Sequence, residues 1–382
     1  MANHAEYHPA TIAAQAASAC DRATGGIVPA IHMATTFARQ PDYALKNTQN
    51  SYLRADSENV RIAEKVLAQL ECGADCLLFS AGMAAVAAML QTVPTGGCVL
   101  KQTQIYYGTG VWFERFCARR NIRLIEFDPA DSESRAQLMV DCRPNLVWIE
   151  TPSNPWLRVT DIAANARDAH AVQAMLVVDS TTATPIISQP LNLGADIVMH
   201  SATKGINGHS DVLAGALVAR APESPVWKTL RADRDMAGAV LGPMDAWLLT
   251  RGMRTLPLRA RKMSENALTL ANYLAEHPAV ETVFYPGLPT HPHHDLARAQ
   301  MTGGFGGLLS FILKGGAERA LQVAGRLQLF HRATSLGGVE SLIEHRQTIE
   351  PHSDIPEGLL RISAGIEDAR DLLSDLDQAL RV

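Results

Sequence analysis

Short runs of consecutive apolar residues recur along the first 200 positions of the chain, and each run stops abruptly at polar residues or glycine. A continuous run, in place of alternating apolar and polar positions, indicates a strand that is buried on both faces, as in parallel sheets covered by helices. Between these runs the apolar positions have helical spacing, for example in residues 60–70. We therefore predict an α/β protein with a mostly parallel sheet, whose strands cover residues 76–79, 98–100, 122–127, 146–150, 175–179 and 196–200.

The chain length and a change of pattern near residue 236 indicate two domains preceded by an arm. The 382 residues exceed the usual size of one domain. Residues 1–45 combine an alanine-rich helical stretch with a segment rich in turn formers, which we interpret as an N-terminal arm that contacts a neighbouring subunit, or else as a disordered leader. Residues 46–235 would form the large domain with the parallel sheet. Residues 236–382 begin with a long helical region, contain further apolar runs and end in a helix, which predicts a smaller C-terminal α/β domain.

Composition and charge argue against several classes of protein. Hydrophobic residues make up 47% of the chain and charged residues 19%, which is typical of a globular protein. The net charge of −5 and the dispersed basic residues give no reason to expect a nucleic-acid partner. No run of apolar residues is long enough to cross a membrane, and the first 20 residues do not resemble a signal peptide. Six cysteines without a C-x-x-C pair predict free thiols, no metal site and a cytoplasmic protein.

Small, hydroxyl-bearing and charged residues follow four of the predicted strands. In an open parallel sheet the ligand binds beyond the carboxyl ends of the strands, so these residues should share one crevice. They are Ser80, Gly82 and Met83 after the first strand, Asn154 after the fourth, Asp179 at the end of the fifth, and Ser201, Thr203 and Lys204 after the sixth.

This set of residues matches the requirements of pyridoxal phosphate. The cofactor needs a lysine for its Schiff base, a carboxylate against its pyridine nitrogen and an anion site for its phosphate. Lys204 lies one strand after Asp179, and the turn at Gly82 opens a predicted helix whose free amides favour a phosphate. Each residue alone is commonplace, because a lysine after a strand is usually exposed and an aspartate there often caps a helix. Their order along the chain is what predicts the cofactor.

Five segments of the chain resemble the Cys/Met-metabolism family of pyridoxal-phosphate enzymes. That family contains cystathionine γ-synthases, cystathionine γ- and β-lyases and methionine γ-lyases. The matching segments are residues 150–155 (ETPSNP), 178–181 (VDST), 200–211 (HSATKGINGHSD), 335–342 (SLGGVESL) and 360–363 (LRIS). The similarity extends from about Gly25 to the C-terminus. It implies a fold-type I, aminotransferase-like architecture and a homotetramer, a dimer of dimers whose active sites are shared between subunits.

The resemblance also implies how the cofactor is held. Lys204 would carry it and act as the base, Asp179 would keep the pyridine nitrogen protonated, and Tyr106 would stack on the ring and take part in catalysis. Asn154 would lie near the ring hydroxyl. The implied phosphate ligands are Gly82, Met83, Ser201 and Thr203, joined by Tyr52 and Arg54 from the neighbouring subunit.

For the substrate, the resemblance implies three contacts and one main reaction. Arg361 would bind the α-carboxylate as a bidentate fork, with Ser335 nearby. Glu340 could hold the distal ammonium of a substrate, or could be a surface residue. We expect γ-elimination on a sulfur amino acid, as in cystathionine γ-lyases, giving a 2-oxo acid, ammonia and a thiol amino acid. The alternatives are γ-replacement as in cystathionine γ-synthases, elimination on another γ-substituted amino acid, and a non-catalytic interaction protein.

Several positions depart from the family pattern, among them residues 57–59 and 180–182 and the four that follow. Gly108 stands where methionine γ-lyases resemble one another in having Cys, and Val111 stands where γ-lyases and γ-synthases tend to have Arg, which weakens the expectation that the distal end of cystathionine binds there. Gly205 replaces an aromatic residue. Arg346 replaces the proline of a Glu-His-Pro segment and could be an anion contact or a surface charge. We further interpret residues 291–294 (HPHH) as an exposed loop and not as a metal site.

Overall fold

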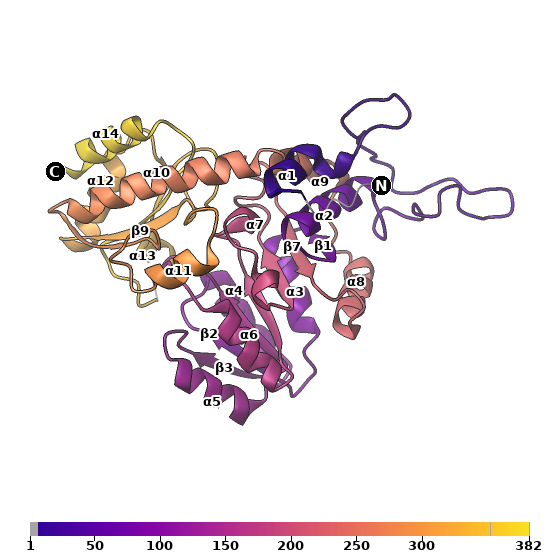
Figure 1. Cartoon of the computed structure of the whole chain (residues 1–382), viewed down its shortest axis with the longest axis horizontal. Coiled ribbons are helices and arrows are strands. Elements are labelled where there is room, and N and C mark those ends of the chain that lie inside the picture. Colours follow the sequence, from indigo (N-terminus) through magenta and orange to yellow (C-terminus); the bar gives the residue numbers. More distant parts are fainter. Residues whose placement is uncertain (1–6, 352, 382) are drawn as a thin grey trace.

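A computed structural model describes residues 7–351 and 353–381, which form two α/β units, each built around one sheet (Figure 1). Helix α10 (Leu256–Glu276) runs from one unit to the other along the top of the view. The predicted fold class, a mostly parallel sheet followed by a smaller α/β unit, is confirmed. None of the helices in the described part of the chain combines the length and the apolar character that crossing a membrane requires.

The larger sheet has seven strands in the order β1-β7-β6-β5-β4-β2-β3, and β7 alone runs antiparallel to its neighbours. The strands are β1 (Asp75–Phe79), β2 (Cys98–Gln102), β3 (Arg123–Phe127), β4 (Leu146–Glu150), β5 (Met175–Asp179), β6 (Ile197–His200) and β7 (Gly215–Ala219). All six predicted strands are confirmed. We did not predict β7, because its glycine and two alanines carry little strand signal. A Cβ at Gly215 would lie 2.1 Å from the carbonyl oxygen of Ala81, so glycine is required where β7 passes the turn after β1.

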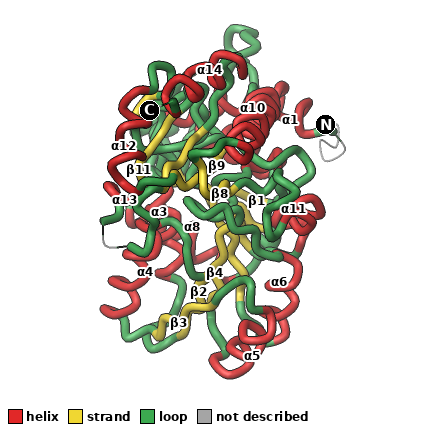
Figure 2. Tube along the Cα trace, turned by 90° about the vertical axis from the view of Figure 1, so that its left-hand side faces the viewer, coloured by secondary structure: helices red, strands yellow, loops and turns green. Residues whose placement is uncertain are grey.

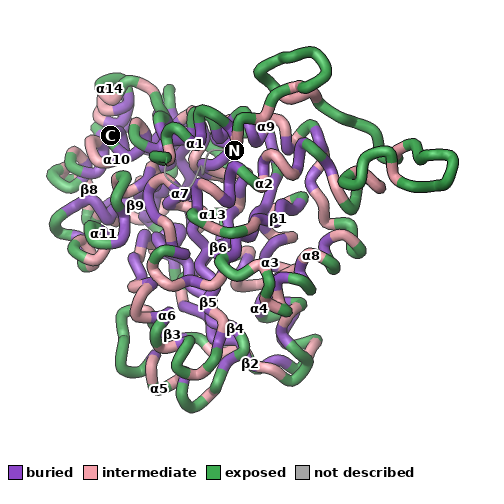
Figure 3. The backbone as a smooth tube through the Cα atoms, turned by 45° about the vertical axis from the view of Figure 1, so that its right-hand side comes forward, coloured by how far each residue is buried: buried purple, intermediate pink, exposed green. Residues whose placement is uncertain are grey.

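Helices cover both faces of this sheet, which explains the continuous apolar runs (Figure 2). Alternate residues of each strand point to opposite faces: in β4, Trp148 packs on one side and Val147 on the other. One face is covered by α3 (Gly82–Gln91), α4 (Tyr107–Arg119) and α8 (Pro225–Ala237); the other is covered mainly by α2 (Glu58–Leu70), α5 (Ser132–Cys142), α6 (Ile162–Ala171) and α9 (Pro243–Met253). The centre of the molecule is consequently buried throughout (Figure 3).

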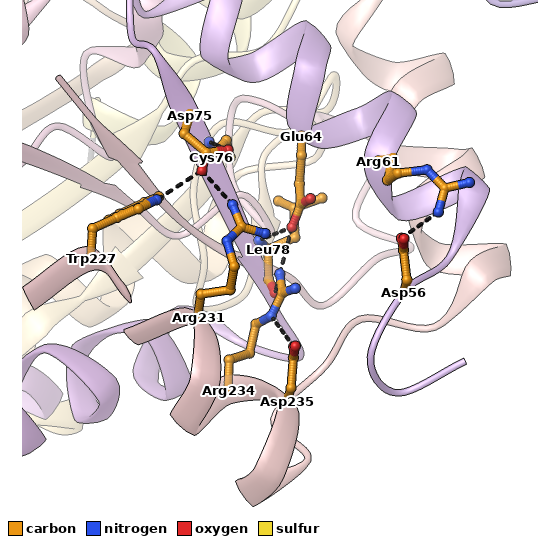
Figure 4. Close-up of polar contacts among 10 residues, drawn as sticks. All are labelled: Asp56, Arg61, Glu64, Asp75, Cys76, Leu78, Trp227, Arg231, Arg234 and Asp235. Atoms are coloured by element: carbon orange, nitrogen blue, oxygen red, sulfur yellow. Dashed lines mark hydrogen bonds and ion pairs between the residues drawn. The ribbon is translucent and has the colours of Figure 1, made fainter. Parts of the chain in front are cut away.

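Side chains satisfy the backbone on the free edge of β1. The amide of Leu78 donates to Oε1 of Glu64 at 2.9 Å, and the Leu78 carbonyl accepts from Nη1 of Arg234 at 3.2 Å (Figure 4). Arg234 and Glu64 also form a buried ion pair at 2.5 Å. Nearby, Nε1 of Trp227 donates to Asp75 at 2.8 Å. These contacts hold α8 against β1, the strand that leads into the turn before α3.

The second sheet has five strands in the order β10-β11-β12-β9-β8. They are β8 (Val280–Phe284), β9 (Leu308–Leu313), β10 (His331–Arg332), β11 (Leu342–His345) and β12 (Leu359–Ser363). Helices α10, α12 (Gly316–Arg326) and α14 (Ala369–Leu380) pack on this sheet, while α11 (His294–Gln300) and α13 (Arg346–Ile349) are short connections. The boundary at residue 235 remains a prediction, and α8 continues past it to Ala237.

The N-terminal segment packs on the molecule at its start and then extends away from it. It begins with α1 (Pro9–Gln15) and a 3₁₀ turn, η2 (Ala16–Ser18), while residues 1–6 of the predicted arm lie outside the described residues. Residues 19–57 then form loops that project to the right in Figure 1 and are largely exposed in Figure 3. These loops leave Ile27, Met33 and Tyr43 exposed. The contact of this arm with a neighbouring subunit remains a prediction.

Candidate active site

A cavity of about 360 Å³ lies at the carboxyl ends of the parallel strands and is closed on its other side by β11, β12 and α13. This size suits a small organic ligand. Of the thirteen residues predicted to form the site, ten line the cavity. They are Gly82, Met83, Tyr106, Asn154, Asp179, Ser201, Thr203, Lys204, Ser335 and Arg361.

Lys204 follows β6 and is partly buried in the cavity wall. Its Nζ donates a hydrogen bond to Oγ of Ser335 at 2.7 Å. Burial, and then the charge of Arg361, lowers the pKa of Lys204, while Glu344 acts in the opposite direction. A lowered pKa makes more of the amine neutral, as a nucleophile or base requires. Ser335 has a φ of 93°, an unfavourable conformation for a residue with a side chain, and its carbonyl accepts from Arg361 Nη2 at 2.7 Å.

Asp179 ends β5 and is fixed through one oxygen. Its Oδ1 accepts from the amide of Thr181 at 3.0 Å and from the Thr181 hydroxyl at 2.5 Å. The same hydroxyl accepts from the amide of Ser201 at 2.8 Å, which ties the end of β5 to the segment that carries Lys204. Burial raises the pKa of Asp179, whereas the Thr181 hydrogen bonds and the charge of His200 lower it.

The start of α3 forms an anion cradle beside this segment. No side chain caps α3 at Ala81, so its first amides have no capping acceptor, and the helix dipole favours an anion there. A Cβ at Gly82 would lie 2.9 Å from Cβ and Oγ of Ser201, so only glycine permits this close approach. The hydroxyl of Thr203 donates to the Ala214 carbonyl at 3.1 Å and accepts from its amide at 2.9 Å, which holds the lysine segment against β7.

Glu150, which was not among the predicted site residues, ends β4 at the cavity wall. Its Oε2 accepts from the amide of Tyr106 at 2.7 Å, and its Oε1 accepts from the amide of Asn154 at 2.7 Å. Burial, with the charge of Asp179, raises the pKa of Glu150 well above its usual value. One carboxyl group therefore positions two of the predicted cofactor contacts. Its position at the end of an apolar run, at the same sheet edge as Asp179, was the sequence signal for it.

Four buried charged residues alternate in sign along the opposite wall. Arg361 on β12 donates to Oδ1 of Asn154 at 2.8 Å and forms an ion pair with Glu344, its partner on β11. Arg346 binds Oε2 of Glu344 at 2.8 Å and also pairs with Glu350. The side chain of Arg346 is only 4% exposed, so its interpretation as a surface charge is wrong. Burial lowers the pKa of Arg361 to about 10.

The other three predicted residues do not line the cavity of their own chain. The carboxylate of Glu340 accepts a hydrogen bond from the hydroxyl of Ser210. Arg54 lies over the ring of Tyr52, 5.1 Å from its centroid, and its Nε donates to the carbonyl of Asp235 at 2.8 Å. Tyr52 is 45% exposed. The roles assigned to these three residues remain predictions.

The structure gives physical reasons for two departures from the family pattern. A Cβ at Gly108 would lie 2.7 Å from Cε1 of Tyr106, so glycine allows the ring to fold over the start of α4. A Cβ at Gly205 would lie 2.9 Å from the methyl group of Thr184. Val111 is half-buried on α4 and is not among the cavity-lining residues.

The described residues include no group of three or more His, Cys, Asp or Glu that could hold a metal ion. The prediction that residues 291–294 form an exposed loop is wrong for His291, which is buried. Burial, together with the neighbouring His293, lowers its pKa to about 4, so the ring is neutral at physiological pH.

These residues fit pyridoxal phosphate. The lysine amine has a lowered pKa, the Asp179 carboxyl group lies in the same cavity, and the uncapped start of α3 leaves room that a Cβ at Gly82 would fill. Such a donor set can hold the aldehyde, ring nitrogen and phosphate of the cofactor.

Comparison with known proteins agrees with this assignment along nearly the whole chain. A family model described as "Cys/Met metabolism PLP-dependent enzyme" matches residues 10–381. The chain is 41% identical to a cystathionine gamma-lyase of Bacillus subtilis, covering 94% of this chain and 96% of the relative. It is 40% identical to a cystathionine gamma-synthase of Mycobacterium bovis, covering 97% and 96%. Among solved structures, the cystathionine gamma synthase from Xanthomonas oryzae pv. oryzae in complex with cystathionine has a TM-score of 0.93 and 38% identity, covering 98% of both chains.

Proposed function

Because the chain belongs to the family of Cys/Met metabolism PLP-dependent enzymes, we propose that it catalyses γ-elimination on a sulfur amino acid. The products would be a 2-oxo acid, ammonia and a thiol amino acid. The observation that carries this proposal is one cavity that holds the lysine amine of Lys204, with its lowered pKa, together with the guanidinium of Arg361. The amine can remove protons from a substrate whose α-carboxylate the guanidinium holds.

When bound, pyridoxal phosphate accepts the electron pair that remains on the substrate once the α proton is removed. Lys204 and Asp179 would hold its aldehyde carbon and ring nitrogen, and the start of α3 its phosphate. Arg361 orients the substrate by its carboxylate, and the hydroxyl of Ser335 directs the amine of Lys204 through their 2.7 Å hydrogen bond. A neutral Lys204 then takes the α proton.

Release of the γ-substituent requires loss of a second proton, from the β carbon. Lys204 is the only lysine among the described residues that line the cavity, so we assign this transfer to it as well, once it has passed the α proton on to the bound cofactor and its amine is neutral again. Tyr106 also lines the cavity and is half-exposed, so its hydroxyl can deliver a proton to the departing sulfur.

Incubation of the purified enzyme with cystathionine tests this proposal. We expect a 2-oxo acid, ammonia and cysteine, each scored separately. A Lys204→Ala variant is the matched control, because it removes the proposed base and should release none of the three. Wild-type enzyme that contains the cofactor and yields none of these products would contradict the proposal.

The second candidate function is γ-replacement, in which a thiol takes the place of the substituent of an activated homoserine ester. The similarity to the cystathionine gamma-synthase of Mycobacterium bovis favours it. Adding cysteine to such an ester distinguishes the two functions, because replacement yields a thioether whereas elimination yields a 2-oxo acid whether or not cysteine is present.

We further propose a homotetramer with shared active sites. Support comes from Tyr52 and Arg54, which lie outside the cavity of their own chain, in the same projecting loops (residues 19–57) as the exposed apolar residues Ile27, Met33 and Tyr43. Lys204→Ala and Arg54→Ala subunits, each inactive alone, can be mixed under conditions that allow subunit exchange. Half of the random dimers are then mixed, and each mixed dimer has one of its two sites intact. About a quarter of the wild-type activity should therefore return. No recovery despite verified exchange would exclude shared sites.

For the location we propose the cytoplasm. Among the described residues all six cysteines carry free thiols, and Cys20 and Cys72 are exposed. Exposed free thiols are typical of a reducing compartment. Cell fractionation with a cytoplasmic marker enzyme tests this assignment, and recovery of the protein with membranes or outside the cell would contradict it.

A further inference from the structure

Two arginines in the cavity wall share one carboxylate oxygen. Nη2 of Arg361 and Nη1 of Arg346 both contact Oε2 of Glu344, the latter at 2.8 Å. Glu350 pairs with Arg346 on its far side. All four residues line the cavity that contains Lys204, and their side chains are between 4% and 7% exposed. Each charge therefore depends on its neighbours for stabilisation, because little of each side chain is exposed to water.

Arg361 cannot bind a substrate carboxylate with both terminal nitrogens unless it releases its present partners. Its Nη1 donates to Asn154 and its Nη2 to the carbonyl of Ser335 and to Glu344. Once Arg361 releases Glu344, Arg346 is the cation that still contacts this buried carboxylate, and without Arg346 the carboxylate would be buried unpaired, which is strongly unfavourable. Glu344 therefore depends on Arg346 at the moment the substrate enters.

Arg346 has the geometry to keep Glu344 neutralised alone. Its Nη1 contacts Oε2 of Glu344 at 2.8 Å, and this contact can persist when Arg361 leaves the same oxygen. Arg346 would then hold the buried carboxylate through a charge-assisted hydrogen bond, which is stronger than one between neutral groups.

We propose that Arg346 is a positioning residue that takes over Glu344 when the substrate carboxylate binds, which frees Arg361 to hold that carboxylate. The proposal rests on the proposed function only in that the ligand is an α-amino acid. The charges argue against direct binding of a second anion by Arg346, because Glu344 and Glu350 already neutralise the two arginines.

The test measures binding of L-alanine to the holoenzyme by calorimetry, because alanine has an α-carboxylate but no γ-substituent to eliminate. Arg346→Met should raise the dissociation constant about tenfold or more, because Glu344 then stays on Arg361. Arg346→Lys should lie between wild type and Arg346→Met, because it keeps the charge but cannot contact Glu344 and Glu350 with two separate nitrogens. Adding Glu344→Gln to Arg346→Met should restore near-wild-type affinity, because the amide no longer competes for Arg361.

Non-additivity in this cycle is the decisive readout, since a purely structural role of Arg346 would not be relieved by Glu344→Gln. Arg135→Met is the matched control: it removes a buried arginine that pairs with Asp168 at 2.6 Å and does not line the cavity, so it should leave alanine binding unchanged. If Arg346→Met does not fold, Arg346→Lys and the double variant still decide the question. Additive effects, or unchanged alanine binding in Arg346→Met, would overturn the proposal.

In steady state, Arg346→Met should raise KM for the reacting substrate and change kcat little. A variant that binds alanine normally, yet loses only substrates with a charged distal group, would show that Arg346 contacts the substrate directly and would also overturn the proposal. Failure of the wild type to release a 2-oxo acid from cystathionine concerns the proposed reaction alone, because the alanine measurement needs no turnover.

Discussion

Replacement of Glu150 should separate its positioning role from its charge. In Glu150→Ala, the amides of Tyr106 and Asn154 lose acceptors that now lie 2.7 Å away. The backbone amide of Asn154 is buried, so the loss of its hydrogen-bond acceptor should lower the unfolding free energy by about 1–3 kcal/mol. The Tyr106 amide is only part-buried, and water can replace much of its bond. In Glu150→Gln the amide oxygen can face Asn154, and the cost should fall to about 1 kcal/mol or less.

The assay is urea unfolding of both variants, together with the dissociation constant of pyridoxal phosphate from each. Cofactor affinity should fall in the same order as stability, because Tyr106 and Asn154 are the contacts that Glu150 positions. The pH adds a second check. Burial raises the pKa of Glu150 in the folded state above its value in the unfolded chain. The protonated carboxyl group therefore stabilises the wild type at low pH, and this contribution is lost as the pH rises from the unfolded pKa through the raised folded pKa. The deficit of Glu150→Gln relative to wild type should therefore shrink as pH rises. Two results would refute this reasoning: equal losses of unfolding free energy in Glu150→Gln and Glu150→Ala, or a stability deficit of Glu150→Gln that grows with pH.

Three further predictions concern other parts of the molecule. Gly82→Ala should weaken cofactor binding about tenfold or more while the apoenzyme still folds, because the new Cβ would lie 2.9 Å from Ser201; equilibrium dialysis of the cofactor measures this. Arg234→Met should lower the unfolding free energy by about 3–5 kcal/mol by leaving Glu64 buried without its cation, and adding Glu64→Gln should recover part of that loss in urea titrations. Burial lowers the pKa of Lys204, so Lys204→Met should stabilise the apoenzyme at neutral pH, and the gain should vanish above the pKa of an unfolded lysine; a gain that is independent of pH would contradict the assigned cause.

The sequence predicted the larger sheet well because its strands are buried on both faces by helices. That environment requires continuous apolar runs, and six of them stand in the chain in the order in which the strands occur. The second sheet was less predictable. Strand β8 has exposed positions within it, and β11 has only four residues, one of which is the charged Glu344. The local pattern of apolar and polar residues cannot reveal such a strand, because a charged residue in it reads as exposed although it is buried.

The same limit explains which parts of the site could be predicted. Asp179 ends an apolar run, and Gly82 and Lys204 follow such runs within a few residues, so the position of each strand end predicted where they would meet. Tyr52 and Arg54 depend instead on the resemblance, because nothing in the pattern of their own segment relates them to the cavity.

Buried charges could not be predicted in the same way, because their burial is stabilised by partners elsewhere in the chain. Arg346 alone reads as a surface residue, and only the arrangement of β11, β12 and α13 brings Glu344, Arg361 and Glu350 around it. A buried arginine with two carboxylate partners is tolerated only where each charge is matched. Any substrate carboxylate that enters this wall must then displace one of the existing pairs. Substrate affinity should therefore depend on how readily Glu344 leaves Arg361 and is held by Arg346, and less directly on the charge of Arg361 itself.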